Sequence, residues 1–194
     1  MRNKTASDVS FTNDDALRDL PHLRKNPMTF SPVCEWAPLM PHDGLRIVAY
    51  RAEHAHAFRD LNLAWIRKYF TVEPRDERDL GDPETYILAP GGYIFMAELN
   101  GEVVGTCALM LEHAGAFELA KMTVAESVRG LGVGRALGDA AIAHARAIGA
   151  RSIELYTNSS LTTAISLYHT LGFVDIPVGS SDFVRADVRM VLEL

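Results

Sequence analysis

Cysteine and surplus positive charge are both scarce in this chain, and each scarcity excludes a class of protein. Two of the 194 residues are cysteines, Cys34 and Cys107, and they form neither a CxxC pair nor a cluster with histidine. Zinc and redox motifs are therefore not predicted, and we expect no metal. Acidic residues outnumber basic ones by 25 to 19, which gives a net charge of −6. No basic patch stands out, so nucleic acid is not an expected partner.

Long apolar runs are missing as well. No stretch approaches the roughly 20 apolar residues of a membrane-spanning helix, and residues 1–19 lack the apolar region of a signal peptide. We therefore expect no membrane partner and a cytoplasmic location. Hydrophobic residues make up 48% of the chain and charged residues 23%, a balance typical of a globular domain.

Proline is concentrated near the N-terminus. Five of the nine prolines fall within residues 1–43, where little apolar periodicity is present. Proline fixes φ and removes a backbone donor, so no regular element is predicted here. We interpret residues 1–43 as an irregular arm, either packed on the domain or a partner chain or left as a mobile tail. The domain proper then covers residues 44–194.

The first half of this domain contains one clear helix and a group of strands. A strand is predicted at 45–51, and apolar residues from Phe58 to Tyr69 recur at helical spacing. Residues 71–90 are polar and rich in proline, which predicts a loop with a short helix near 76–80. Strands are expected at 93–99, 102–111 and 116–124. Asn100-Gly101 between the first two is a strong hairpin signal, because both residues of a type I′ turn need positive φ.

Helices and strands alternate in the second half. Leu137 to Ile148 follow helical spacing, with Gly149 placed to end the helix. A strand is predicted at 152–157, an N-cap at 158–160 and a short helix from Leu161 to Leu171. The last strands are predicted at 173–176 and 187–194. An antiparallel meander of strands is thus followed by alternating helices and strands, an order typical of an α+β domain.

The turn between the third strand of the meander and the next helix carries the clearest chemical signal. Gly130, Gly132 and Gly134 alternate there, which leaves backbone N–H groups unobstructed at a helix N-terminus, where the dipole also favours an anion. Arg129 and Arg135 add positive charge, so a diphosphate fits the turn. The P-loop pattern and the GxGxxG fingerprint both fail here, which disfavours ATP and dinucleotides. The alternative is a glycine turn that holds no ligand.

This segment resembles a known signature. Residues 129–134, RGLGVG, are similar to the [RQ]xxGx[GA] motif of the GNAT acetyltransferase superfamily, and 118–124 and 155–173 resemble its flanking motifs. The likeness extends to bacterial members that are fused to winged-helix regulators. It implies the GNAT fold, an α+β domain whose mixed, mostly antiparallel sheet has a splay between strands four and five that holds acetyl-CoA. The cofactor-binding residues implied in this way are Met122, Thr123, Val124, Arg129, Gly130, Leu131, Gly132, Val133, Gly134, Arg135, Asn158 and Tyr168.

Two residues are the catalytic candidates. Tyr168 matches the family tyrosine whose hydroxyl approaches the thioester sulfur as general acid, and a phenol with a pKa near 10 holds its proton at neutral pH. The alternative is a core tyrosine. Glu118 matches a glutamate that some members use to deprotonate the amine, often through water; the alternative is an exposed strand glutamate. His144 and His169 are interpreted as packing or surface residues.

The resemblance implies an N-acetyltransferase that moves acetyl from acetyl-CoA to a primary amine by direct attack. A non-catalytic acyl-CoA sensor of the same fold is the alternative, and another nucleotide-binding enzyme is disfavoured. The amine is a small molecule or a peptide, and Trp65, Tyr69 and Tyr86 are candidates to line its pocket. For Trp65 and Tyr69 the favoured alternative is a core position, because they belong to the apolar stripe of the helix. Dimers are common in the superfamily, so a homodimer is one expectation for the assembly.

Overall fold

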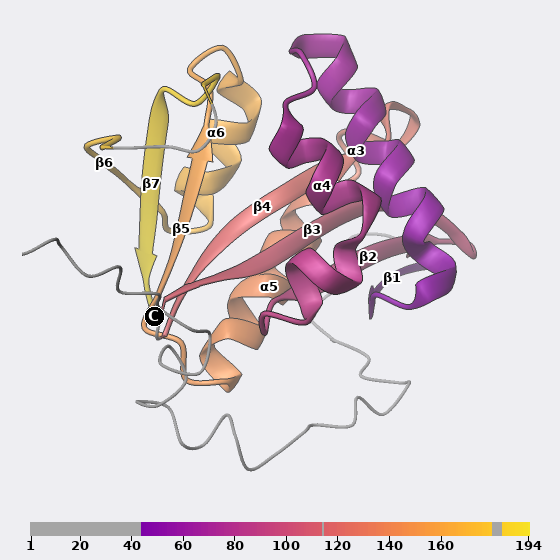
Figure 1. Ribbon diagram of the computed structural model, residues 1–194, viewed down its shortest axis with the longest axis horizontal. Helices are drawn as coiled ribbons and strands as arrows, with labels where there is room; N and C mark the ends of the chain where they lie inside the picture. The colour runs from indigo at the N-terminus through magenta and orange to yellow at the C-terminus, as the bar shows by residue number, and fades with distance from the viewer. Residues whose placement is uncertain (1–43, 114, 180–183) are drawn as a thin grey trace, which may run out of the picture.

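One seven-stranded sheet organises the domain (Figure 1). The computed structural model describes residues 44–113, 115–179 and 184–194, so the expectation for the N-terminal arm lies outside the described residues. The strand order is β1-β2-β3-β4-β5-β7-β6, and only the β4–β5 pair is parallel. The strands are β1 (Leu45–Ala49), β2 (Tyr93–Leu99), β3 (Glu102–His113), β4 (Ala116–Val124), β5 (Ser152–Thr157), β6 (Val174–Ile176) and β7 (Val188–Glu193). The predicted α+β class with a mostly antiparallel mixed sheet is confirmed.

Helices cover both faces of this sheet. The helices are α3 (Ala55–Tyr69), α4 (Pro74–Gly81), α5 (Val133–Ala147) and α6 (Thr162–Thr170). Strand β2 shows how the two layers divide, because Phe95 faces the cluster beneath α5 while Ile94 and Met96 face the cluster beneath α3. Successive side chains of a strand point to opposite faces, so a strand covered on both sides is apolar at nearly every position. Among the described residues no helix is both long and apolar enough to cross a membrane.

The hairpin between β2 and β3 forms at the predicted turn. Asn100 has a φ of 53° and Gly101 a φ of 87°, as a type I′ turn requires. The helix predicted from Phe58 to Tyr69 is also confirmed, and Gly149 follows the end of α5 with a φ of 75°. These features follow from local patterns, which is why the sequence alone predicts them.

The short helix predicted near 76–80 is confirmed as α4, but two other expectations near the helices are wrong. The remainder of residues 71–90 is not all loop, since it contains a helical turn at Glu84–Leu88. Pro74 at the first helical position and a capping box between Glu73 and Asp76 start α4. The predicted side-chain N-cap for α6 is also absent: Leu161 occupies that position, and Asn158 Oδ1 accepts a hydrogen bond from the Ser160 N–H instead.

Strand β4 contains a bulge that redirects one side chain. Thr123 lies opposite Thr106 and Ala120 opposite Ala108, so two residues of β4 face one residue of β3. Lys121, within the bulge, has a φ of 50°, which is uncommon for a residue with a Cβ. A bulge re-aims a side chain relative to its strand. Here the Lys121 side chain reaches the acidic residues of α4.

Strands β4 and β5 separate after a short parallel pairing. Only Ala116–Glu118 of β4 pair with Ser152–Glu154 of β5, although both strands continue beyond. Figure 1 shows the two strands diverging from this point. The edge of β4 after Glu118 therefore lacks a strand partner on the β5 side. This is the splay that the resemblance implies.

Gly92, at the start of β2, is a test of the packing beneath the first strands. A Cβ at this position would lie 2.5 Å from the Ile87 carbonyl oxygen and 2.6 Å from that of Leu109, both backbone atoms. We expect Gly92→Ala to lower the free energy of unfolding by about 1–3 kcal/mol. Gly81→Ala is the matched control, since nothing lies within 4 Å of its Cβ position. Urea denaturation measures both; equal stability of the two variants contradicts the packing described.

Candidate active site

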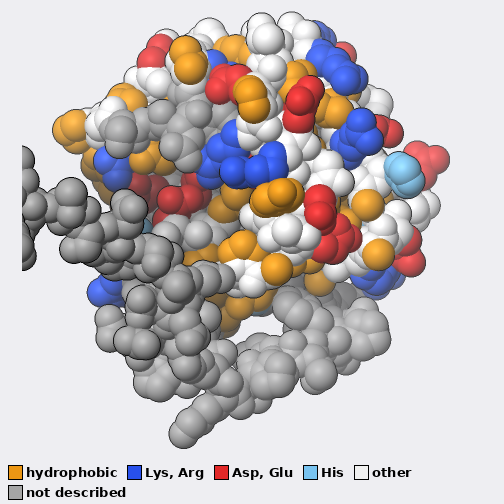
Figure 2. All heavy atoms as spheres, viewed as in Figure 1, with side chains coloured by type: hydrophobic (Ala, Val, Ile, Leu, Met, Phe, Trp, Pro, Cys, Tyr) orange, Lys and Arg blue, Asp and Glu red, His pale blue; other side chains and the backbone are white. Residues whose placement is uncertain are grey.

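A cavity of about 710 Å³ occupies the region where β4 and β5 part. The sequence-predicted residues line it, with the exception of Leu131, which packs against the core beneath α5. The cavity also reaches α3, α4 and the segment before β7. Acidic and basic side chains lie next to one another near the middle of this face of the molecule (Figure 2). The predicted residues that line the cavity are Glu118, Met122, Thr123, Val124, Arg129, Gly130, Gly132, Val133, Gly134, Arg135, Asn158 and Tyr168.

One end of the cavity is formed by the N-terminus of α5. Gly130 and Gly132 have φ values of 83° and 77°, in the left-handed region that glycine tolerates best. Gly132 is the N-cap and offers no side chain to bond the first N–H groups of the helix. At Gly134 a Cβ would lie 3.3 Å from Leu167 Cδ2 across the cavity. Uncapped N–H groups and the helix dipole together favour an anion at this end.

Two exposed arginines flank that end of the cavity. Arg129 Nη1 lies 3.3 Å from the Tyr69 hydroxyl and 3.3 Å from Glu126 Oε1. Arg135 Nε lies 3.1 Å from Asp139 Oδ2, one helical turn further along α5. Both side chains therefore have surface partners and carry positive charge beside the helix N-terminus.

Glu118 lines the cavity at the point where β4 and β5 begin to part, and it is buried, which excludes the interpretation of an exposed strand residue. Its Oε2 accepts a hydrogen bond of 3.2 Å from Arg75 Nη2 of α4. Burial raises the pKa of Glu118 to about 7, although the positive charges of Arg75 and Lys121 oppose the rise. A carboxyl group with this pKa exchanges protons near neutrality.

Tyr168 of α6 lies across the splay from β4 and is half-buried. Its ring packs edge-on against Phe173, with 6.1 Å between centroids, which fixes the direction of the side chain. Burial raises the pKa of the Tyr168 hydroxyl to about 12. The hydroxyl therefore holds its proton throughout the neutral range.

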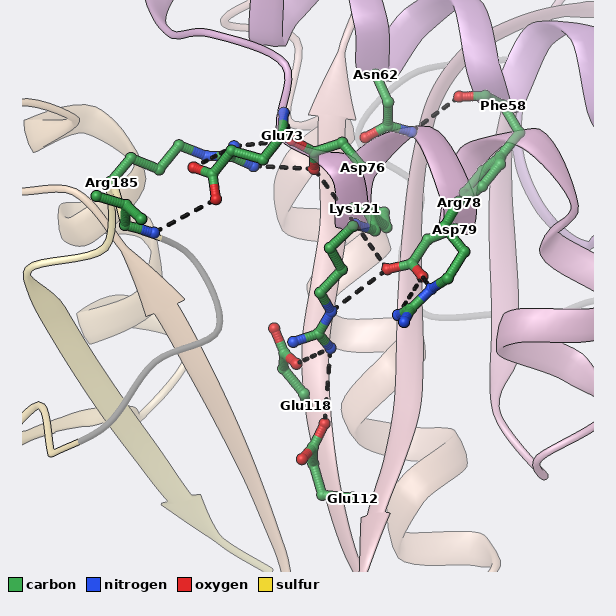
Figure 3. Close-up of polar contacts among 12 residues, drawn as sticks. Phe58, Asn62, Glu73, Asp76, Arg78, Asp79, Glu112, Glu118, Lys121 and Arg185 are labelled. Atoms are coloured by element: carbon green, nitrogen blue, oxygen red, sulfur yellow. Dashed lines mark hydrogen bonds and ion pairs between the residues drawn. The ribbon is translucent and has the colours of Figure 1, made fainter.

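Buried ion pairs connect α4 to both sides of the cavity (Figure 3). The guanidinium of Arg185, just before β7, donates to both carboxylate oxygens of Asp76 at 2.8 and 2.9 Å. Lys121 Nζ lies 3.5 Å from Asp76 and 3.1 Å from Asp79. Burial alone would raise the pKa of Asp76, but the hydrogen bonds from Arg185 and the nearby charges hold it below its ordinary value.

Sequence reasoning missed this group because its members are far apart in the chain and polar. Asp76, Lys121 and Arg185 all line the cavity. The one local signal is the capping box at the start of α4, which includes Asp76.

Asn158, at the end of β5, is engaged with the protein in this structure. Its Nδ2 donates to the carbonyl oxygen of Arg185 at 2.7 Å, and its Oδ1 accepts from Ser160. The side chain thus connects the end of β5 to the segment before β7. A contact between Asn158 and a cofactor stays a prediction.

The two histidines contribute no proton-transfer group to the cavity. His144 is buried between Tyr93 and Phe95, with 4.1 and 5.5 Å between ring centroids, and burial lowers its pKa to about 4. It packs as a neutral group, as expected. His169 is exposed, and its Nε2 lies 3.3 Å from Asp175.

Two of the three aromatic residues expected to line the acceptor pocket line this cavity, and the third does not. Trp65 and Tyr69 of α3 line the cavity, with 5.5 Å between their ring centroids. Tyr86 is not among the lining residues: it is exposed, and the Arg78 guanidinium lies over its ring at 5.2 Å. The expectation that Tyr86 lines this pocket is therefore wrong, because the helical turn at Glu84–Leu88 directs it outward. Cys107 is buried beneath α5, and burial raises its pKa, consistent with an inert core thiol.

Comparison with known proteins identifies the family. A model described as the acetyltransferase (GNAT) family matches residues 56–173, and the chain belongs to this family. An uncharacterized N-acetyltransferase, YjgM, of Escherichia coli is 36% identical over 110 residues, covering 54% of this chain and 66% of that protein. An N-acetylaspartate synthetase of Xenopus tropicalis is 33% identical over 117 residues, covering 59% of this chain and 43% of that protein.

A solved structure agrees with this assignment. A Bacillus subtilis acetyltransferase in complex with CoA is 26% identical, with a TM-score of 0.59, and the match covers 77% of this chain and 99% of that chain. The curated relatives are longer than the matched region, since the match spans 66% of the Escherichia coli protein and less than half of the Xenopus protein.

The raised pKa of Glu118 predicts a specific pH dependence of stability. The folded chain retains a proton on Glu118 that the unfolded chain releases above pH 4.5. The contribution of protonated Glu118 to the free energy of unfolding is therefore complete below pH 4.5 and is lost as the pH rises through about 7. Between pH 5 and pH 8, wild type should therefore lose roughly 1–3 kcal/mol of unfolding free energy relative to Glu118→Gln. Urea denaturation of both proteins measures this difference.

The matched control is Glu53→Gln, which alters a glutamate outside the cavity with a largely exposed side chain. Its stability relative to wild type should change little between the two pH values. A Glu118→Gln difference that is also constant with pH contradicts the raised pKa.

Proposed function

We propose that the protein transfers an acetyl group from acetyl-CoA to a primary amine. The observation that supports this best is one cavity that contains both the glycine-lined N-terminus of α5 and the pair Glu118 and Tyr168. A diphosphate site alone fits many proteins. An anion site joined to a proton acceptor and a proton donor fits transfer between a phosphate-bearing carrier and an amine.

The cavity fits the carrier along its length. The N–H groups at the start of α5 suit the pyrophosphate, with Arg129 and Arg135 beside it. The edge of β4 after Glu118 has no strand partner on the β5 side and lines the cavity, so its backbone groups, including those of Met122 and Val124, suit the amide-bearing pantetheine arm. The side of the cavity formed by β4 and the start of α5 is completed by Thr123, Gly130, Gly132, Val133 and Gly134. Leu131 supports this side from the core.

The proton balance assigns a role to each catalytic candidate. Acetyl-CoA supplies the acetyl thioester. The amine must lose one proton before attack, and Glu118 accepts it and returns it to solvent. As the carbon–nitrogen bond forms and the carbon–sulfur bond breaks, Tyr168, protonated at neutral pH, donates its proton to the leaving sulfur as general acid. The nitrogen loses its second proton in the same step, and this proton restores the Tyr168 hydroxyl through solvent, so one proton leaves the amine and one reaches the thiol.

An acyl-CoA sensor of the same fold is the second candidate. It would use the α5 end of the cavity and have no need for a carboxyl group that titrates near neutrality. The burial and raised pKa of Glu118 therefore support the enzyme over the sensor.

Other expectations remain proposals. The relatives' names do not agree on an acceptor, so neither defines one for this chain. The finer likeness to acetyltransferases fused to winged-helix regulators, a homodimeric assembly, a cytoplasmic location and the arm at residues 1–43 all stay predictions from the sequence.

The decisive experiment combines binding with turnover. Calorimetric titration with acetyl-CoA should give micromolar binding that weakens when the 3′,5′-ADP half of the ligand is removed. Release of the CoA thiol is then followed with a panel of amines. Binding without release on any amine favours the sensor, and no binding contradicts both candidates.

Gly132→Val tests the proposed pyrophosphate site at the start of α5. A side chain there would have to adopt a φ of 77° and would compete with the bound phosphate, so we expect CoA affinity to fall at least about 10-fold. Gly149→Val is a matched control for strain, because Gly149 has a φ of 75° at the opposite end of the same helix. It should cost stability and leave affinity unchanged. Equal loss of affinity in both variants contradicts the assignment.

Tyr168→Phe tests the donor role. Removing the hydroxyl should lower kcat about 10- to 1000-fold, while the Kd for acetyl-CoA changes much less, because the hydrogen bond matters most as sulfur leaves. Tyr86→Phe, outside the cavity, is the control and should change neither quantity. Unchanged turnover in Tyr168→Phe would exclude the donor role.

A further inference from the structure

The end of the cavity away from the glycine turn has its own character. We call it the acceptor end, and it comprises seven residues: Asn62, Trp65, Phe70, Asp76, Glu118, Lys121 and Arg185. Asn62, Trp65 and Phe70 form its less polar side. Four charged side chains of both signs complete it: Asp76, Glu118, Lys121 and Arg185.

These charges are largely removed from solvent. The exposed fractions of the side chains are 1% for Asp76, 4% for Lys121, 5% for Glu118 and 19% for Arg185. A buried charge is costly unless it is paired. A molecule that enters must therefore leave each of them with a partner of opposite sign, which favours a molecule that itself carries both signs.

Arg185 already holds two carboxylates in this structure, since its Nη1 also donates to Glu73 Oε1 at 3.0 Å. Its two Nη atoms donate to the two oxygens of Asp76, the bidentate geometry that a guanidinium offers to any carboxylate. Its Cζ lies 5.9 Å from the centre of the Phe70 ring, and its carbonyl oxygen is held by Asn158. The guanidinium is thus positioned by groups on both sides of the splay.

We infer that the acceptor is an amine that also carries a carboxylate close by, as an amino acid does, and that Arg185 binds this carboxylate. The incoming carboxylate shares or replaces Asp76 on the Arg185 guanidinium, and Lys121 remains beside Asp76 to balance its charge. The amine then faces Glu118, on the same wall of the cavity. This inference rests on the proposed acetyl transfer and names its substrate class.

Other amine classes fit the acceptor end less well. A polyamine would add positive charge beside Lys121 and Arg185 without supplying an anion. An apolar amine would enter a site whose charged groups it cannot pair with. An acceptor with one amine and one carboxylate pairs its amine with the acidic side chains of the acceptor end and its carboxylate with the basic ones.

The test compares matched pairs of acceptors. Each L-α-amino acid of a panel is assayed beside its α-carboxamide, which has the same side chain and amine but no negative charge, by release of the CoA thiol. A nearby carboxylate favours the protonated amine, so intrinsic reactivity favours the amide. We expect wild type to prefer at least one amino acid over its amide by about 10-fold or more in kcat/KM.

Variants assign the preference to Arg185. Arg185→Gln should lower the ratio of kcat/KM for the amino acid to kcat/KM for its amide by about 10- to 100-fold. The ratio should fall because kcat/KM for the amino acid falls, while the value for the amide changes little. Arg185→Lys keeps the positive charge but cannot form two parallel hydrogen bonds to one carboxylate, so it should give an intermediate ratio. Arg189→Gln is the control: this arginine of β7 pairs with Glu154 at 2.6 Å and is not among the cavity residues. It should leave the ratio unchanged.

The outcomes separate the inference from the proposed function. Transfer to amides, polyamines or peptide N-termini without any preference for the free carboxylate overturns the inference and leaves acetyl transfer standing. An equal loss of activity on acid and amide in Arg185→Gln shows a structural role and also overturns it. Binding of acetyl-CoA with no transfer to any amine counts against the proposed function, and the inference falls with it.

Discussion

The short parallel pairing between β4 and β5 is the constraint on which the rest of the structure depends. Three residues of each strand pair, and the strands then part. A sheet that stayed closed would satisfy its backbone groups and leave no space between these strands. Because it opens, α5 on one side and α3 with α4 on the other enclose a cavity with backbone along one wall. Every group assigned a chemical role here lies along that opening.

Burial then gives the side chains around the opening their chemical properties. Glu118 and Tyr168 are ordinary residue types, and removal from solvent raises the pKa of both, one toward neutrality and one away from it. One group therefore exchanges protons at neutral pH while the other keeps its proton. The positive charges of Arg75 and Lys121 keep the pKa of Glu118 from rising further. The two roles differ because the surroundings differ.

The sequence alone predicts the strand order along the chain, the α5 helix and the glycine turn, because each has a local pattern. It fails where the stabilising contacts join distant residues. The ion pairs that tie Asp76 and Asp79 of α4 to Lys121 and Arg185 produce no apolar periodicity, so the sequence predicts the short helix without its contacts. Arg185 is placed by Asp76 and Asn158, which lie far from it in the chain. Glu118 was a candidate, but its burial depends on elements that pack over it.

The bulge at Lys121 has a consequence for what β4 would lose if it were one residue shorter. Thr123 lies opposite Thr106 and Ala120 opposite Ala108, with two residues of β4 between them and one of β3. Deleting one residue of the bulge would keep both pairs in register, so Thr123 and Val124 would stay on their present faces. The deletion would remove the left-handed position from which Lys121 reaches Asp76 and Asp79. The extra residue of β4 therefore serves the ion pairs with α4, and the pairing of β3 with β4 does not require it.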